Sequence, residues 1–150
     1  MPQPQTEHHK GEIVSQATTA AFAAPGPERQ FREHLAQGRF VIQRCGSCAG
    51  YLFPPRQVCP HCGGIEMGWE DATGRGTVYA VTVVNRRAED GGPYNVVLVD
   101  LAEGPRMMSR VENIDNDGVV IGLGVEARIA KDETNGPHIV FDPAGRGGDA

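Results

Sequence analysis

The hydrophobic pattern of the chain changes from helical near the N-terminus to extended further along. Within residues 27–38, Phe31 and Leu35 are four residues apart, which places both on one face of a helix. Pro27 suits the first helical position and Gly38 suits the C-terminal cap. The pattern predicts a short helix with one narrow apolar face, which packs either on its own domain or on a partner.

Residues 73–142 have the texture of short β-strands. They are rich in β-branched residues and are divided by turns that contain Gly, Asn and Pro. The predicted strands are residues 77–85, 95–101, 106–111, 125–130 and 138–141. Five short strands without a second long helix predict a small closed or sandwiched β domain, of which the five-stranded oligomer-binding (OB) barrel is one type.

The remaining segments complete the predicted organisation. The N-terminal 26 residues are rich in Gln, Thr, Ala and Pro without apolar periodicity, and the last eight residues include three Gly. Such compositions predict disorder. The predicted division is a disordered arm (1–26), a helix (27–38), a cysteine-containing ribbon (39–72), a β domain (73–142) and a disordered tail (143–150).

Length and charge narrow the class of protein. A chain of 150 residues suits one domain, or two small ones that share a core. No apolar run approaches the roughly 18 residues of a membrane span, and the N-terminus lacks the pattern of a signal peptide, so we expect a cytoplasmic protein. The net charge is −5, and residues 77–142 contain six basic and eleven acidic side chains. This balance disfavours a nucleic-acid groove in the β domain.

The four cysteines, Cys45, Cys48, Cys59 and Cys62, form two Cys-x2-Cys pairs within 18 residues. Two intervening residues let one tight turn direct both sulfurs at a single ion, and two such turns make a tetrahedral site. Disulfides would not persist in a reducing cytosol, so the pattern indicates a metal centre. Four thiolates leave no open coordination position, which predicts structural zinc. Iron in a rubredoxin-type site uses the same ligands and is less expected, because nothing else suggests electron transfer.

No self-contained active site is evident in the sequence. It contains neither a Gly-rich phosphate-binding loop nor a Gly-x-Ser-x-Gly nucleophile motif. His34 and His138 fit packing or surface positions better than the position of a catalytic base. His61 lies inside the second cysteine pair, where the ligand set is already complete. We therefore expect a protein that is not itself an enzyme.

The order of the motifs resembles a known family. After the predicted helix come Gly38-Arg39-Phe40, the cysteine pairs with Phe53-Pro54-Pro55-Arg56 between them, Gly74-Arg75-Gly76-Thr77-Val78-Tyr79, and Asp100-Leu101-x-Glu103-Gly104. This order resembles the acyl-CoA-associated proteins that join a rubredoxin-like zinc ribbon to an OB-fold domain. The resemblance spans about residues 28–142. It implies a mainly β protein with an N-terminal helix, a four-cysteine zinc ribbon and a five-stranded OB-fold barrel.

The resemblance also implies a function. Members of this family are accessory subunits of thiolase-like or other acyl-CoA-processing enzymes, which contribute to complex assembly and to acyl-CoA binding or channelling. One alternative is an autonomous acyl-CoA-binding module. A lesser alternative is a single-stranded nucleic-acid-binding OB protein, which needs a basic groove with exposed aromatic residues. The acidic β domain disfavours it, and Tyr79 and Phe141 lie within strands where core packing is expected.

Arg56 and Arg75 are the candidate ligand-binding residues. Arg56 follows two prolines that hold the next side chain in a defined direction, and Arg75 lies between two glycines. Either guanidinium suits a CoA phosphate or a carboxylate of a partner. The alternative role for each is to brace the ribbon against the β domain.

Overall fold

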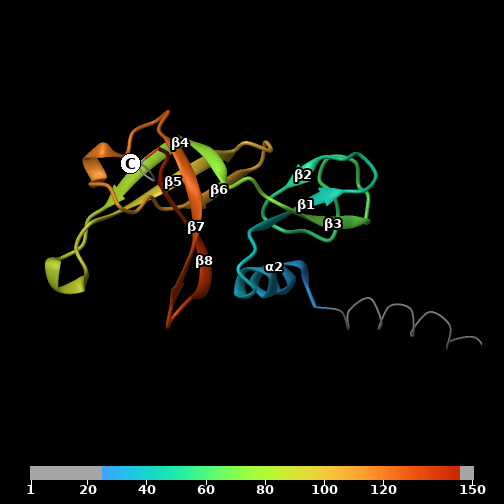
Figure 1. Ribbon diagram of the computed structural model, residues 1–150, viewed down its shortest axis with the longest axis horizontal. Coiled ribbons are helices and arrows are strands. Elements are labelled where there is room, and N and C mark those ends of the chain that lie inside the picture. Colours follow the sequence, from blue (N-terminus) through green and yellow to red (C-terminus); the bar gives the residue numbers. More distant parts are fainter. Residues whose placement is uncertain (1–24, 146–150) are drawn as a thin grey trace, which may run out of the picture.

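A computed structural model of the chain describes residues 25–145 (Figure 1). Its elements are α2 (Pro27–Ala36), β1 (Val41–Cys45), β2 (Tyr51–Leu52), β3 (Met67–Asp71), β4 (Arg75–Val84), β5 (Tyr94–Leu101), β6 (Arg106–Ser109), β7 (Gly124–Asp132) and β8 (Gly136–Pro143). Two short 3-10 turns, Ala88–Asp90 and Asn116–Gly118, complete them. The mainly β fold class with one described α-helix is confirmed. The predicted disordered arm (1–26) and tail (143–150) lie outside the described residues except for residues 25–26 and 143–145, of which Pro143 is the last residue of β8.

Helix α2 ends where the sequence places its cap. Gly38 has a left-handed φ of 81°, which a glycine adopts without steric cost. Its N–H donates to the Leu35 carbonyl, and the N–H of Arg39 donates to the His34 carbonyl, both at 2.9 Å. These two bonds make a Schellman motif, which satisfies the last carbonyls of the helix and turns the chain toward β1.

The strands form two sheets, which Figure 1 shows side by side. The smaller sheet has the order β2-β1-β3 and carries the cysteine turns. The larger has the order β6-β5-β4-β7-β8, with every ladder antiparallel, and curls into a half-barrel. Five strands in this arrangement confirm the OB-type fold that the sequence predicts.

The half-barrel is closed by the segment that follows β6. Residues 106–111 are predicted as one strand, but β6 ends at Ser109 because the chain then leaves β5 for β8. Val111 forms a parallel bridge with Phe141. The buried Asn95 side chain takes the place of a strand partner for Val111: its Oδ1 accepts from the Val111 N–H at 2.8 Å, and its Nδ2 donates to the Val111 carbonyl at 2.9 Å.

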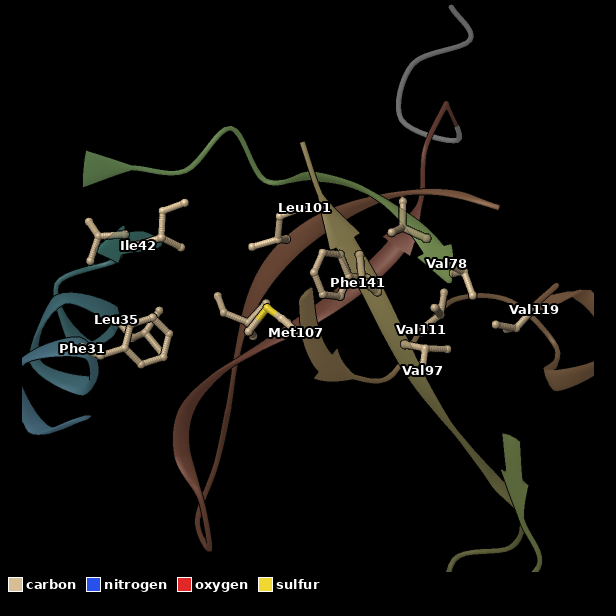
Figure 2. Packing of buried hydrophobic residues seen from close by; sticks show 14 residues of the cluster. Phe31, Leu35, Ile42, Val78, Val97, Leu101, Met107, Val111, Val119 and Phe141 are labelled. Atoms are coloured by element: carbon tan, nitrogen blue, oxygen red, sulfur yellow. The ribbon is translucent and has the colours of Figure 1, made fainter. Parts of the chain in front are cut away.

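One hydrophobic core joins the helix, the ribbon and the half-barrel. Phe31 and Leu35 of α2 are buried together with Ile42 of β1 and with the interior residues of the large sheet. Figure 2 shows Met107 between the two helix residues and Phe141. The apolar face of α2 therefore packs on its own chain, which decides between the two alternatives that the sequence leaves open.

One aromatic residue of β4 does not lie where the sequence predicts. Tyr79 is expected in the core, but Val78 is the buried residue, and because side chains alternate along a strand Tyr79 faces outward. It is 50% exposed, and the Arg106 guanidinium lies 3.3 Å from the centroid of its ring. A β-bulge follows, where the register of β4 against β5 shifts between Val78 and Ala80. Phe141, by contrast, is fully buried as expected.

Candidate metal centre

The two cysteine turns use the same hydrogen-bond pattern. In each turn, the carbonyl of the first cysteine accepts a hydrogen bond from the backbone N–H of the residue four positions later. The N–H of that same first cysteine donates to the carbonyl of the residue five positions later. These bonds are 2.8–2.9 Å long and involve Cys45, Ala49 and Gly50 in one turn, and Cys59, Gly63 and Gly64 in the other. The repeated pattern explains why two Cys-x2-Cys sequences produce two matching halves of one site.

The four sulfur atoms lie within 4.8 Å of one another. The Sγ atoms of Cys45 and Cys62 are 3.5 Å apart, and those of Cys48 and Cys59 are 3.7 Å apart. A tetrahedral ion with metal–sulfur bonds of about 2.3 Å would set these distances near 3.8 Å. The donor set and its spacing therefore fit a four-coordinate metal. Within residues 25–145 no other group of three or more potential ligands is found.

Small residues allow the turns to close around the sulfurs. A side chain at Gly64 would place its Cβ 2.8 Å from the Ser47 Oγ and 3.3 Å from the Cys45 Sγ. At Gly50, a Cβ would lie 3.3 Å from the Cys48 Sγ. Cys45 and Cys59 are buried, whereas Cys48 and Cys62 are exposed. The site is thus closed on its inner side and reaches the surface through one cysteine of each turn.

The surroundings of the thiols affect their pKa values in opposite directions. The backbone N–H of Cys48 stabilises the Cys45 thiolate and, against the effect of burial, lowers the pKa of Cys45 to about 6. At Cys62 the backbone N–H of Gly64 lowers the pKa, but the Cys45 sulfur, burial and the other two sulfurs raise it on balance to about 12. In the absence of a metal, four crowded thiols cannot all ionise, because the thiolates would repel one another. A bound cation removes this repulsion.

An ion-pair network connects the three strands of the ribbon. Glu70 of β3 accepts hydrogen bonds from the Tyr51 hydroxyl of β2 at 2.8 Å and from the Arg44 guanidinium of β1 at 3.0 Å. The hydrogen bond from Arg44, followed by that from Tyr51, lowers the pKa of Glu70, while the bond between Tyr51 and Glu70 raises the pKa of Tyr51. The network fixes the sheet that carries both cysteine turns.

The two candidate arginines lie on different elements. Arg56 is in the loop between β2 and the second cysteine turn, and Arg75 is the first residue of β4; both are exposed. Every other arginine in residues 25–145 has an ion pair or lies over an aromatic ring. Arg56 and Arg75 have neither within this part of the chain. Whether either guanidinium binds a ligand stays a prediction.

Arg56 borders two pockets of the ribbon, neither of which includes Arg75. A pocket of about 400 Å³ lies between the ribbon and the β5–β6 turn, and contains Arg56, His61 and Glu103. A second pocket, of about 420 Å³, lies between the start of α2 and the outer face of the ribbon. His61 is exposed and lies outside the metal-ligand cluster, as expected.

Gln43 is a residue of this region that sequence reasoning missed. Its side chain is 3% exposed, and its Oε1 accepts a hydrogen bond of 2.6 Å from the backbone N–H of Arg56. The loop carrying Arg56 is therefore anchored to the central strand β1. A polar residue in a short strand gives no sequence signal for such a long-range bond.

The ribbon and the half-barrel each match a described protein family. Residues 32–67 match the family described as ChsH2, rubredoxin-like zinc ribbon domain, and residues 69–130 match ChsH2, C-terminal OB-fold domain.

No helix in residues 25–145 is long and apolar enough to cross a membrane.

Curated relatives share the same region of the chain. A DUF35 domain-containing scaffold protein of Methanocaldococcus jannaschii is 33% identical over 100 residues, which cover 62% of this chain and 71% of that protein. A probable enoyl-CoA hydratase alpha subunit of Thermomonospora curvata is 38% identical over 95 residues. The match covers 62% of this chain but 30% of that subunit, so the chain corresponds to less than a third of its length.

Two solved structures resemble the fold. A chain of the Ltp2-ChsH2(DUF35) aldolase aligns with a TM-score of 0.72 and 33% identity, covering 81% of this chain and 98% of that one. A DUF35 protein of unknown function from Sulfolobus solfataricus aligns with a TM-score of 0.58 and 18% identity, covering 89% and 99% respectively. The second likeness is one of fold alone.

Proposed function

Because the chain belongs to the DUF35 family of ChsH2-type zinc-ribbon and OB-fold proteins, we propose that it is a non-catalytic accessory subunit of an enzyme that processes acyl-CoA. The observation that carries this proposal is the structural likeness to a chain of the Ltp2-ChsH2(DUF35) aldolase, nearly the whole of which aligns with this protein. Relatives named scaffold proteins support a role in assembly. A closed set of four thiolates, without room for a substrate, is consistent with it.

Zinc is the proposed metal. Cys45, Cys48, Cys59 and Cys62 would hold it, and its role would be to stabilise the ribbon, because a four-thiolate site has no open position for chemistry. The match to a rubredoxin-like zinc ribbon favours zinc, while iron has the same ligand chemistry. We also propose a cytoplasmic location, since reduced thiols persist there.

The proposed contribution to the reaction is complex assembly together with acyl-CoA binding or channelling. A thiolase-like enzyme is the proposed partner, and a hydratase or aldolase is the other class that the names of the relatives suggest. Arg56 and Arg75 are the proposed anion-binding residues, because both guanidinium groups are exposed and without an ion pair among the described residues. Guanidinium groups suit phosphates and carboxylates equally well.

Reconstitution tests this proposal. The chain and each candidate thiolase-like, hydratase or aldolase enzyme from the same genome would be co-expressed, and CoA-thioester turnover measured with and without the chain. A stoichiometric complex whose activity depends on the chain is the expected result. Saturable binding of CoA thioesters by the chain alone, without any enzyme partner, would favour the autonomous module instead. Steeply salt-dependent binding to single strands would indicate the nucleic-acid function.

A further inference from the structure

The outer face of the ribbon combines exposed apolar side chains with a free cation. Val58 is 52% exposed and Ile65 is 76% exposed, and both line the pocket of about 420 Å³ beside α2. Met67 and Trp69, further along on the same face of β3, extend the apolar surface inward. We call these four residues together with Arg56 the ribbon groove. Large apolar side chains gathered at a surface mark sites of contact with other molecules.

Arg56 is the only charged residue among those that line this pocket. Its neighbours in the lining are three glutamines, two prolines and the apolar residues of the groove. Its backbone is held by the buried Gln43 side chain, so the guanidinium projects from a fixed point of the loop. No acidic side chain of residues 25–145 pairs with it, although nearly all other described arginines are paired.

From this charge pattern we propose that the ribbon groove is the docking surface for the partner enzyme, and that the partner presents an apolar side chain next to a carboxylate. The apolar side chain would cover Val58 and Ile65, and the carboxylate would pair with Arg56. This inference rests on the proposed accessory function and specifies the chemistry of the partner. An exposed, unpaired arginine at the edge of an apolar patch is an arrangement that can select and orient an acidic partner.

A matched pair of peptides tests the groove in the absence of the enzyme. The full-length, metal-loaded protein would be titrated with N-acetyl-Leu-Glu-Leu-amide and, separately, with N-acetyl-Leu-Gln-Leu-amide, while the backbone, methyl and arginine side-chain NMR signals are followed. We expect saturable shifts centred on Arg56, Val58 and Ile65. The Glu peptide should bind about threefold more tightly than the Gln peptide, as expected for an exposed charge pair.

Substitutions separate the charge from the apolar surface. Arg56→Gln should abolish the preference for the Glu peptide, whereas Arg75→Gln should keep it, because Arg75 is equally exposed and unpaired but lies outside the groove. Ile65→Ser should weaken the binding of both peptides. All three side chains are exposed, so the fold should persist, which the dispersion of the remaining signals would verify.

Other occupants give other results, and each would overturn the inference. Equal affinity for the two peptides, or no saturable shift up to a peptide concentration of about 10 mM, would show that the groove does not select an acidic partner. Larger Arg56-dependent shifts with CoA would assign the arginine to a phosphate. Shifts that depend on protein concentration would indicate a second copy, and contacts of Phe22 with Ile65 in the free chain would indicate its own N-terminal segment. Peptide binding requires no enzyme, so failed reconstitution would refute the proposed function without deciding this test.

Discussion

Ala49 and Gly63 occupy equivalent positions in the two cysteine turns but differ in how well they suit the backbone. Their φ values are 61° and 75°, both in the left-handed region. A Cβ in this region costs roughly 1–2 kcal/mol, which glycine avoids. The first turn therefore carries strain that the second does not, and the difference is a property of a single residue.

Two single substitutions, each introducing the residue of the other turn, should change the free energy of unfolding in opposite directions. Ala49→Gly is expected to stabilise the metal-loaded protein, by up to about 1 kcal/mol after the larger unfolded-state entropy of glycine is subtracted. Gly63→Ala is expected to destabilise it by about 1 kcal/mol. Urea unfolding at constant metal concentration would measure both free energies. A loss of stability in Ala49→Gly would contradict the strain argument.

Arg128 is the most heavily paired arginine of the half-barrel. Its Nε donates to Asp142 at 2.8 Å, and its Nη2 donates to Glu112 at 2.6 Å. The hydrogen bond from Arg128 is the main cause of the lowered pKa of Asp142, with a smaller contribution from Asn113. A carboxyl with a lowered folded-state pKa stabilises the fold above its unfolded pKa, near 4, and this contribution disappears as the pH falls through the folded value.

Asp142→Asn should consequently change the dependence of stability on pH. At pH 7 we expect a loss of about 1 kcal/mol, a modest value because Arg128 is 41% exposed. Below pH 4 the variant and the parent should converge, since Asp142 becomes protonated in both states of the parent as the pH falls. Urea unfolding of both proteins across pH 3–7 would reveal the trend. A constant difference over that range would mean that the ion pair is not responsible.

At the scale of the element, the ribbon depends on its metal more than on its own core. The apolar cluster around its cysteine turns is limited to Cys45, Leu52, Cys59 and the partly buried Met67. The other buried apolar residues of β1 belong to the core shared with α2 and the half-barrel. So small an apolar cluster cannot offset the entropy of ordering the turns. Binding of structural zinc contributes on the order of 10–16 kcal/mol in small zinc domains, which is enough to do so.

Cys59→Ser is accordingly expected to unfold the cysteine turns while the half-barrel remains folded. Loss of dispersed NMR signals and rapid proteolysis should be confined to residues between β1 and β4. His61→Ala is the matched control, because His61 lies in the same turn but outside the ligand cluster, and should retain one metal ion per chain. Metal content measured by atomic emission would also distinguish zinc from iron. An intact ribbon after metal removal by a chelator would refute the structural role.

At the scale of the whole molecule, α2 couples the ribbon to the half-barrel. Phe31 and Leu35 share one core with Ile42 of the ribbon and with Met107 and Phe141 of the half-barrel (Figure 2). Figure 1 shows the helix beneath the ribbon on the side of β8. A residue that packs against both parts should transmit a disturbance to both.

Leu35→Ala tests this coupling. Leu35 is almost fully buried, so the cavity should cost about 2–5 kcal/mol of unfolding free energy. We expect faster metal release to a chromogenic chelator and a lower midpoint of the β-sheet circular dichroism signal, because both parts lose packing. Arg29→Ala, on the exposed face of the same helix, should change neither by much. A change in only one of the two signals would show that the parts are independent.

The chain sequence determined the features that depend on local spacing. Each Cys-x2-Cys turn directs its two sulfurs to one side because the turn has a fixed geometry, and Gly38 ends α2 because a residue free to adopt positive φ completes that cap. The strand segments likewise follow from β-branched residues between turn residues.

Only the tertiary structure decided the features that join residues distant in the chain. The closure of the half-barrel depends on Asn95 meeting Val111, and the anchoring of Arg56 depends on Gln43. The exposure of Tyr79 depends on which face of β4 packs on the core. The pocket that the ribbon groove lines combines the segment from β2 to β3 with the start of α2. Contacts of this kind depend on how segments that are distant in the chain pack against one another, which the spacing of residues within one segment does not specify.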